Sequence, residues 1–213
     1  MDRAILVFSK SADADTVKTR LRSVISDENC VSLAMALLQD TIAKILLIDA
    51  DQYLYLNGSG ALTFSPAIPV QAQSGGDLGD RMLNAFEESL RRYAKVLIIG
   101  TDSPFFPPQI LEQAFAGLDS HDVVLGPAED GGYYLIGLKE SIPRIFAGIP
   151  WGTPTVLKRT LSILQGRSVM LLPGAFDIDE PKDLERFQSE LAKSDAAYLQ
   201  HSREWMKGFQ SAT

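Results

Sequence analysis

The chain has 213 residues, of which 46% are hydrophobic and 22% are charged, and its formal net charge is −7. A chain of this length can bury a sizeable core without cross-links, so we expect one domain spanning residues 1–213. The acidic balance disfavours contact with a phosphate backbone, and we therefore expect no nucleic-acid partner.

Apolar runs and helical patterns alternate in the first half of the chain. A strand is predicted at Ile5–Phe8 and a helix over Val31–Ile48. A second helix is predicted because apolar residues recur every four positions from Leu78 to Leu90. The next strand is predicted at Val96–Ile99, and prolines in the first turn mark a helix over Pro107–Leu118.

The second half of the chain continues in the same way. A strand at Val123–Leu125 is followed closely by Gly132–Leu138, a β-rich stretch bounded by glycine, and the gap is too short for a helical crossover. We therefore predict that this stretch is a strand that leaves the regular winding. A helix over Thr153–Leu164, a strand at Val169–Leu172 and a helix over Pro181–Leu191 come next.

This alternation predicts the fold class. Continuous apolar strands separated by helices are typical of a covered, largely parallel sheet. We predict a single α/β domain with a mostly parallel central sheet and helices on both faces. The polar tail from about Ser194 is predicted to be a helix docked on the body of the domain or on a neighbouring subunit, which leaves a homodimer open.

Targeting signals and metal-binding residue types narrow the class of protein further. No apolar run approaches the ~18 residues of a membrane span, and the residues after Met1 lack the features of a signal peptide. We therefore expect a cytoplasmic protein without a transmembrane segment. Cys30 is the single cysteine, and His121 and His201 are the two histidines. A bound metal would thus be held mainly by carboxylates, which suit Mg²⁺ or Mn²⁺.

Cationic residues follow the first predicted strand. In an open α/β sheet, ligands bind beyond the carboxyl ends of the strands. Lys10 lies there, followed by Lys18, Thr19 and Arg20 at the start of a helical segment. Ammonium and guanidinium groups beside backbone N–H groups suit the diphosphate of a nucleotide. The alternative is a solvated basic helix start.

Carboxylates follow two later strands. Asp102 comes after the strand at Val96–Ile99, and Asp177 and Asp179 come after the last strand, on one face of an extended stretch. All three are candidate ligands of a metal that bridges the phosphates. The alternatives are a turn residue for Asp102 and helix capping by Asp179 or Asp183, and we assign Asp183 to that capping role.

Two glycine-containing segments supply the remaining site residues. Gly76, Asp77 and Arg81 surround a helix start and are assigned to the nucleotide site, with base, ribose and acceptor all open as contacts. The alternative is that Asp77 only caps the helix.

The second segment contains two adjacent acids, the predicted catalytic residues Glu129 and Asp130. One of them would accept the proton of an acceptor hydroxyl. Gly131 and Gly132 would let the acceptor approach the backbone, and Tyr133 or Tyr134 would stack on a sugar. An acidic hairpin turn is the alternative.

Six segments in chain order carry a family resemblance. They are Val17–Leu21, Gly76–Met82, Gly100–Pro104, Gly126–Tyr134, Ile149–Trp151 and Asp177–Asp179. Over about Ile5 to Leu184 the chain resembles a family of uncharacterised bacterial proteins with a glycosyltransferase-A-like, Rossmann-type fold. That family is related to the nucleotide-diphospho-sugar transferases and to guanylyltransferases acting on molybdopterin or phospholactate. The resemblance implies a nucleoside diphosphate sugar or nucleoside triphosphate and a small-molecule acceptor as partners, and it places Trp151 with the acceptor or sugar.

The first loop departs from the family pattern. The family usually carries a loop with proline and glycine there, but this chain has Ser11–Thr16, and its first glycine is Gly58. A loop without glycine wraps phosphates less closely, and Asp13 and Asp15 would repel them. This departure disfavours tight triphosphate binding.

Three functions fit the sequence. The first is metal-dependent glycosyl transfer from a nucleoside diphosphate sugar. The second is nucleotidyl transfer from a nucleoside triphosphate to a phosphorylated acceptor, with release of pyrophosphate, and it ranks second because of the altered loop. The third is a module that binds a sugar nucleotide without catalysis.

Overall fold

The computed structural model describes residues 2–11, 17–58 and 68–212. These residues form seven strands: β1 (Arg3–Lys10), β2 (Asp51–Asn57), β3 (Val70–Ala72), β4 (Lys95–Ile99), β5 (Val123–Pro127), β6 (Tyr133–Leu138) and β7 (Val169–Leu171). They also form six α-helices: α1 (Asp27–Ile45), α2 (Leu78–Ser89), α3 (Gln109–Ser120), α4 (Val156–Ile163), α5 (Pro181–Lys193) and α6 (Gln200–Ala212). Most of the glycine-free loop, residues 12–16, lies outside the described residues.

All seven strands join one sheet in the order β3-β2-β1-β4-β6-β5-β7. Every neighbouring pair is parallel except the two that involve β6, which runs antiparallel to β4 and β5. The predicted mostly parallel sheet is confirmed, and so is the prediction that Gly132–Leu138 leaves the regular winding. The hairpin between β5 and β6 brings their connecting turn to the edge of the sheet where the parallel strands end.

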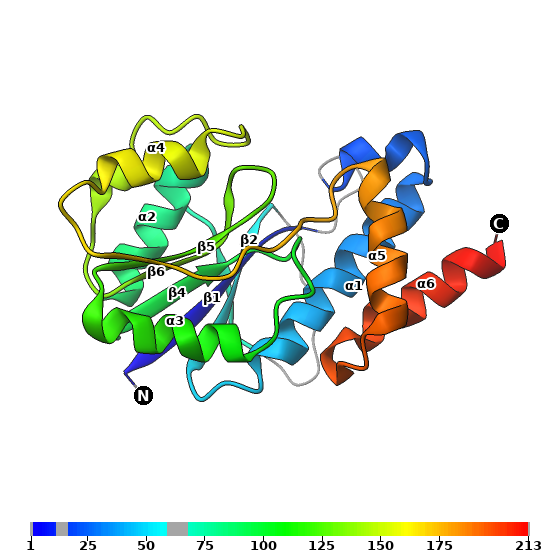
Figure 1. Ribbon diagram of the computed structural model, residues 1–213, viewed down its shortest axis with the longest axis horizontal. Coiled ribbons are helices and arrows are strands. Elements are labelled where there is room, and N and C mark those ends of the chain that lie inside the picture. The colour runs from blue at the N-terminus through cyan, green and yellow to red at the C-terminus, as the bar shows by residue number, and fades with distance from the viewer. Residues whose placement is uncertain (1, 12–16, 59–67, 213) are drawn as a thin grey trace.

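Helices cover both faces of the sheet, as predicted (Figure 1). On one face, α1 and α3 bury Ile42 and Phe115 against the strands. On the other face, α2 buries Phe86, and Leu157 of α4 packs against the same cluster. The molecule is thus a single three-layer α/β domain, with its two main cores on opposite sides of one sheet.

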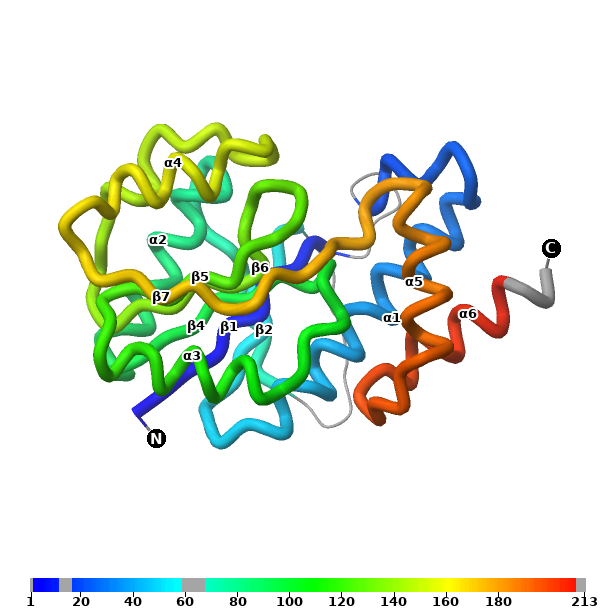
Figure 2. Tube along the Cα trace, viewed as in Figure 1, coloured from blue at the N-terminus to red at the C-terminus, as the bar shows by residue number. Residues whose placement is uncertain are grey.

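The tail packs on its own chain. Figures 1 and 2 show α5 and α6 beside α1, beyond the end of the strands. Phe187 of α5 and Met206 of α6 share a buried cluster with Leu33 of α1. The first turn of α6 is also fixed by Asp40, whose carboxylate accepts hydrogen bonds from the backbone N–H groups of His201 and Ser202, both at 2.9 Å. The predicted tail helix therefore docks on the body of the domain.

A buried lysine connects α1 to the segment after β4. Lys44 is 1% exposed, and its ammonium donates a hydrogen bond to the Pro104 carbonyl at 2.7 Å. The same nitrogen lies 3.6 Å from the centroid of the Phe106 ring. Burial lowers the pKa of Lys44 to about 7, and the Asp40 carboxylate opposes that shift. Lys44 thus fixes the chain just beyond Asp102 and Ser103 at the cost of a desolvated charge.

The Lys44→Met variant tests this depressed pKa. Above about pH 7 the folded state loses the Lys44 proton, whereas the unfolded state keeps it up to the ordinary lysine pKa of about 10.4. The wild type should therefore gain stability relative to the variant as the pH rises through this window, by up to about 1.4 kcal/mol per pH unit. Urea unfolding of both proteins at several pH values measures this difference. A difference that stays flat across the window would contradict the lowered pKa.

Two strands at one side of the sheet, β2 and the edge strand β3, were not predicted from the sequence. β2 carries tyrosines and only two leucines in DQYLYLN, and β3 is three exposed residues long. Both lie on the side of the sheet next to β1, where they complete it. Within residues 2–11, 17–58 and 68–212, no helix has the length and apolar character that crossing a membrane requires.

Candidate functional site

A cleft of about 460 Å³ lies at the edge of the sheet where the parallel strands end. Its walls come from the carboxyl ends of β1 and β2, the residues after β1, β3 and β4, and the turn between β5 and β6. The first turn of α2, the segment before α4 and the segment between β7 and α5 complete them. This is the position at which an open α/β sheet binds its ligands. The cleft therefore collects residues from segments that are far apart in the chain.

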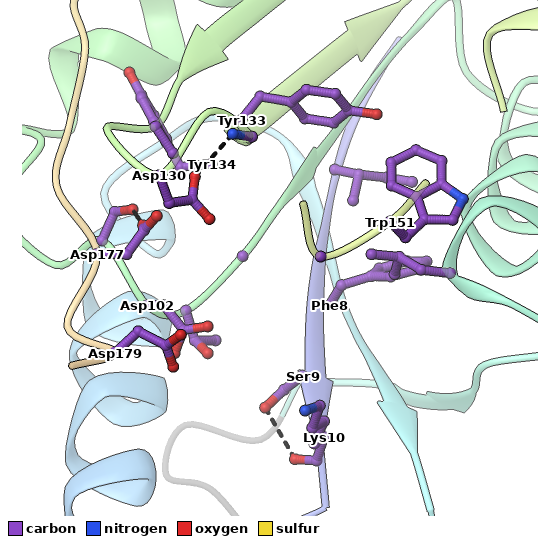
Figure 3. Close-up of a pocket in the computed structure, with 18 of the residues that line it drawn as sticks. Phe8, Ser9, Lys10, Asp102, Asp130, Tyr133, Tyr134, Trp151, Asp177 and Asp179 are labelled. Atoms are coloured by element: carbon purple, nitrogen blue, oxygen red, sulfur yellow. Dashed lines mark hydrogen bonds between the residues drawn. The ribbon is translucent and has the colours of Figure 1, made fainter. Parts of the chain in front are cut away.

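Four carboxylates gather on one side of the cleft (Figure 3). Asp102 follows β4, Asp130 lies in the turn before β6, and Asp177 and Asp179 precede α5. A backbone hydrogen bond from Ile178 N to Asp102 O, 3.0 Å long, joins two of these segments. The three predicted metal ligands are thus brought to one place by strands that the sequence separates by about seventy residues.

Each of the three predicted metal ligands has a partner in the protein. The Lys18 ammonium pairs with the Asp102 carboxylate and donates to the Ile178 carbonyl. Ser103 donates from its hydroxyl to Asp177, and Arg20 pairs with Asp179 at 2.9 Å. Two of the predicted phosphate-binding cations, Lys18 and Arg20, are therefore paired with predicted metal ligands.

Lys18 is held in an unusual conformation. Its side chain is 4% exposed, and its backbone has φ 47°, the left-handed region that non-glycine residues rarely adopt. Strained backbone of this kind persists where surrounding contacts fix it, and it clusters at functional sites. The contacts of the Lys18 side chain with Asp102 and Ile178 supply that fixation.

The clustered carboxylates influence the pKa of Asp177. The pKa of Asp177 is raised to about 7, chiefly by burial; the Ser103 hydroxyl opposes this shift, the nearby Asp102 and Asp130 carboxylates add to it, and the Lys18 ammonium opposes it. Such a concentration of carboxylates stabilises a bound cation.

The residues present fit a metal that is shared with phosphates. No group of three or more histidine, cysteine or acidic side chains within the described residues is arranged to enclose a metal. Mg²⁺, however, is commonly held by one or two carboxylates together with substrate phosphates. Asp102 and Asp179 have side chains that are 56% and 45% exposed and line the cleft, so they are available for such a shared site.

The structure separates the two predicted catalytic acids. Asp130 lines the cleft, and its Oδ1 accepts a hydrogen bond from Gly132 N at 2.8 Å. Glu129 lies outside this cleft and binds Arg186 through both carboxylate oxygens, at 2.6 and 3.0 Å. That pairing lowers the pKa of Glu129. Only Asp130 is therefore brought to the cleft.

The glycine pair after Asp130 has two roles. Gly131 has φ +88°, and an added Cβ would lie 2.2 Å from the Pro154 carbonyl oxygen, so this position accepts only glycine without rearrangement. Its own carbonyl accepts from Leu157 N at 2.9 Å, at the start of α4. Gly132 lines the cleft. Gly131 thus shapes the turn, whereas Gly132 forms part of the cleft surface.

The predicted nucleotide residues divide between the cleft and the surface. Lys10, Lys18 and Arg81 line the cleft. Asp77 is exposed and caps α2, since its side chain accepts from Asp80 N at 2.9 Å. Gly76 beside it is exposed as well.

The residues Thr19 and Arg20 do not line the cleft, although Arg20 reaches it through Asp179. Asp183 caps α5, as predicted, because its Oδ2 accepts from the Asp179 and Glu180 N–H groups.

The other side of the cleft is aromatic (Figure 3). Tyr133 and Trp151 pack edge to face with their ring centroids 6.3 Å apart, and Phe8 lies beside them. Trp151 rests against Gly79 of α2, where an added Cβ would lie 2.6 Å from the indole nitrogen. Glycine at position 79 therefore allows Trp151 to lie against α2 at the mouth of the cleft.

One family model matches more than half of the chain. The family is described as "Uncharacterized protein conserved in bacteria (DUF2064)", and the match covers residues 33–153. This chain belongs to the DUF2064 family. No curated protein matches it.

Solved structures similar to the DUF2064 chain share its fold. A "putative nucleotide-diphospho-sugar transferase" from Desulfovibrio desulfuricans G20 is 30% identical, with a TM-score of 0.85 over 95% of this chain and 94% of its own. Rv0371c from Mycobacterium tuberculosis H37Rv, solved with manganese, is 16% identical, with a TM-score of 0.54 over 87% of this chain and 97% of its own. The 2-C-methyl-D-erythritol 4-phosphate cytidylyltransferase from Thermus thermophilus is 15% identical, with a TM-score of 0.58 over 91% of this chain and 100% of its own. The DUF2064 chain is thus a member of the nucleotide-diphospho-sugar transferase superfamily.

Several cleft residues of the DUF2064 chain were missed in the sequence. Ser103 directly follows the candidate ligand Asp102 but was not itself predicted, and it donates to Asp177. Asn57 ends β2 and Gln73 follows β3, and both line the cleft. Gln73 donates from Nε2 to the Ser9 and Tyr55 carbonyls, at 3.1 and 2.9 Å. The rule that function gathers after strands would have found both residues, had β2 and β3 been recognised.

Proposed function

We propose that this chain is a metal-dependent glycosyltransferase that moves a sugar from a nucleoside diphosphate sugar to a small-molecule acceptor. The observation that carries the proposal is the division of one cleft into two sides. Lys18 and the carboxylates Asp102 and Asp179 lie on one side, and the aromatic rings of Tyr133 and Trp151 lie on the other. The first side suits a diphosphate with a metal, and the second suits an uncharged ring.

The proposed donor site lies at the end of the cleft that holds Lys18. Lys10 and Lys18 would bind the phosphates, with Lys18 leaving its pairing with Asp102. Asp102, with Asp179 or Asp177, would hold Mg²⁺ or Mn²⁺, which neutralises charge on a departing diphosphate. The 30% identity to a protein described as a nucleotide-diphospho-sugar transferase supports this assignment.

Asp130 is the proposed base. As the acceptor oxygen bonds to the anomeric carbon, the bond from that carbon to the phosphate oxygen breaks, and the nucleoside diphosphate leaves with the electron pair. The acceptor proton passes to the Asp130 carboxylate, which the Gly132 N–H holds in place. Glu129 is left out of this role because it is paired with Arg186 outside the cleft.

Calorimetry followed by turnover assays tests the proposal. Nucleoside diphosphates are titrated with and without Mn²⁺, and nucleoside diphosphate sugars are then assayed for release of free nucleoside diphosphate. Release supports glycosyl transfer. Release of pyrophosphate from a nucleoside triphosphate and a phosphorylated acceptor would instead show that the reaction is nucleotidyl transfer. Tight binding without turnover in either assay would leave a sugar-nucleotide-binding module.

Asp102→Asn is expected to weaken nucleoside diphosphate binding in Mn²⁺ by at least about tenfold, while binding without metal is kept. An amide supplies an oxygen but no charge to the metal, and it also frees Lys18 for the phosphates. The matched control is Asp119→Asn, since Asp119 is likewise paired with a lysine, Lys95, but lies on α3. Equal manganese dependence in Asp102→Asn and wild type would remove Asp102 from the metal site.

A further inference from the structure

The first turn of α2 presents a cation to the cleft. Leu78, Arg81 and Met82 all line it, at spacings of three and four residues that place them on one face of the helix. Asp77 and Asp80 on the same turn are exposed. Arg81 is therefore the charged group that this helix contributes to the cleft.

Arg81 has no protein partner for its buried nitrogen. Its Nε is inaccessible to solvent and donates no hydrogen bond to any described residue. No carboxylate in the described part of the chain forms an ion pair with it either. A buried guanidinium donor without an acceptor is costly, so its retention in a cleft points to an anion supplied by a ligand.

Apolar side chains line the cleft together with Arg81. Its helix neighbour Met82 belongs to the buried cluster between α2 and the sheet, together with Phe8 and Ile136. Tyr133 and Trp151 pack against the same cluster. An anion that pairs with Arg81 would thus be attached to a body that lies against apolar and aromatic side chains, where the weak screening strengthens the pairing.

Arg81 and Lys18 belong to opposite walls of the cleft. Lys18 lies just before the short helix η1 (Thr19–Ser23), which packs against α5, and its ammonium contacts Asp102 and the Ile178 carbonyl. Arg81 lies on α2, which covers the other face of the sheet. The proposed donor phosphates account for Lys10 and Lys18, and Arg81 is left as a further cation of the cleft.

We propose that Arg81, with Tyr133 and Trp151, forms an acceptor subsite for a molecule that carries a carboxylate or phosphate group on an apolar or aromatic body. The planar guanidinium recognises either oxyanion through paired hydrogen bonds. The assignment of this subsite to the acceptor rests on the proposed glycosyl transfer, whereas the chemistry of its ligand does not.

Fluorescence of Trp151 reports this subsite directly. The measurements use the Trp205→Phe background, because Trp205 of α6 is the second tryptophan of the chain and packs away from the cleft. Benzoate, phenyl phosphate, phenol and inorganic phosphate are titrated without nucleotide or metal. We expect the two aromatic anions to bind more tightly than phenol, which lacks the charge, and than inorganic phosphate, which lacks the ring. A preference between benzoate and phenyl phosphate then distinguishes a carboxylate from a phosphate ligand.

Arg81→Met should weaken binding of the preferred aromatic anion by about 10- to 100-fold and leave phenol unchanged, because a hydrogen bond to a charged group is lost. Arg81→Lys keeps the charge but lacks the planar guanidinium, so its affinity for the aromatic anion should lie between those of the wild type and Arg81→Met. The matched control is Arg91→Met, since Arg91 is exposed just beyond α2. An unfolding midpoint within the range of the control shows that each variant is folded.

Two results would overturn the proposal. One is equal affinity of the aromatic anions in wild type and Arg81→Met. The other is loss of phenyl phosphate binding in Lys18→Met and not in Arg81→Met, which would place the anion at the donor end. Because these titrations contain no nucleotide, failure of nucleoside diphosphate binding would refute the proposed function and leave the anion subsite standing.

Discussion

Asp130→Asn is expected to reduce the rate of sugar transfer by about 10²- to 10⁴-fold, whereas Glu129→Gln keeps nearly the wild-type rate. Asp130 lines the cleft and is oriented by Gly132 N, whereas both oxygens of Glu129 are bound by Arg186 outside it. The two adjacent acids thus form a matched pair of variants with the same chemical change. Donor binding should be normal in both, because the proposed function assigns the donor phosphates to Lys10 and Lys18 and the metal to the other carboxylates.

Turnover with an acceptor found by screening measures this effect, and calorimetry with the nucleoside diphosphate measures donor binding. Slow transfer of the sugar to water, seen as release of nucleoside diphosphate, serves as a first assay. Wild-type turnover by Asp130→Asn with a true acceptor would reject Asp130 as the base. Loss of donor binding in that variant would instead move Asp130 into the donor site.

Phe187→Ala is expected to lower the free energy of unfolding by about 3–5 kcal/mol. Phe187 is fully buried, and its ring lies 5.9 Å from Phe105 and 6.3 Å from Trp205, centroid to centroid. Phe105 in turn stacks on Phe176 at 5.3 Å. Phe105 closely follows Asp102, and Phe176 directly precedes Asp177, so these rings hold together the two segments that carry the carboxylates.

The same variant should therefore weaken manganese-dependent nucleotide binding even where it is still folded. Phe115→Ala is the matched control, because Phe115 is 1% exposed in the core under α3, away from the carboxylates. We expect a similar loss of stability in urea unfolding for both variants, and a loss of affinity for Phe187→Ala alone. Equal affinities in the two folded variants would show that the aromatic cluster stabilises the domain without positioning the site.

The sequence predicts the fold where apolar character is strong. β1, β4 and β5 are buried on both faces, so their continuous apolar runs are unambiguous. β3 is fully exposed, and β2 mixes polar and apolar residues, so neither shows a comparable run. These two strands are specified by pairing with β1 rather than by their own composition.

Some residues of the candidate site can be predicted from the sequence, and others cannot. Lys18, Asp102 and Asp177 were found because residues after strands converge at one edge of the sheet. The difference between Glu129 and Asp130 depends on the folded turn before Gly131, in which Asp130 lines the cleft and Glu129 pairs with Arg186. The isolation of Arg81 depends on its whole surroundings, since only the assembled cleft shows that no described acid reaches it. Neither the different positions of Glu129 and Asp130 nor the isolation of Arg81 can be predicted from spacing along the chain.

The central position of β1 affects how this chain is made. β1 ends at Lys10, but its neighbour β4 begins at Lys95, so a large part of the chain must leave the ribosome before β1 has both partners. β5 and β6, by contrast, are joined by a short turn and can pair as soon as they are synthesised. A nascent or truncated chain that stops before Lys95 would carry the apolar strand Ile5–Phe8 with one open edge. That is the arrangement from which aggregation begins, so fragments of this protein should depend on chaperones more than the complete chain does.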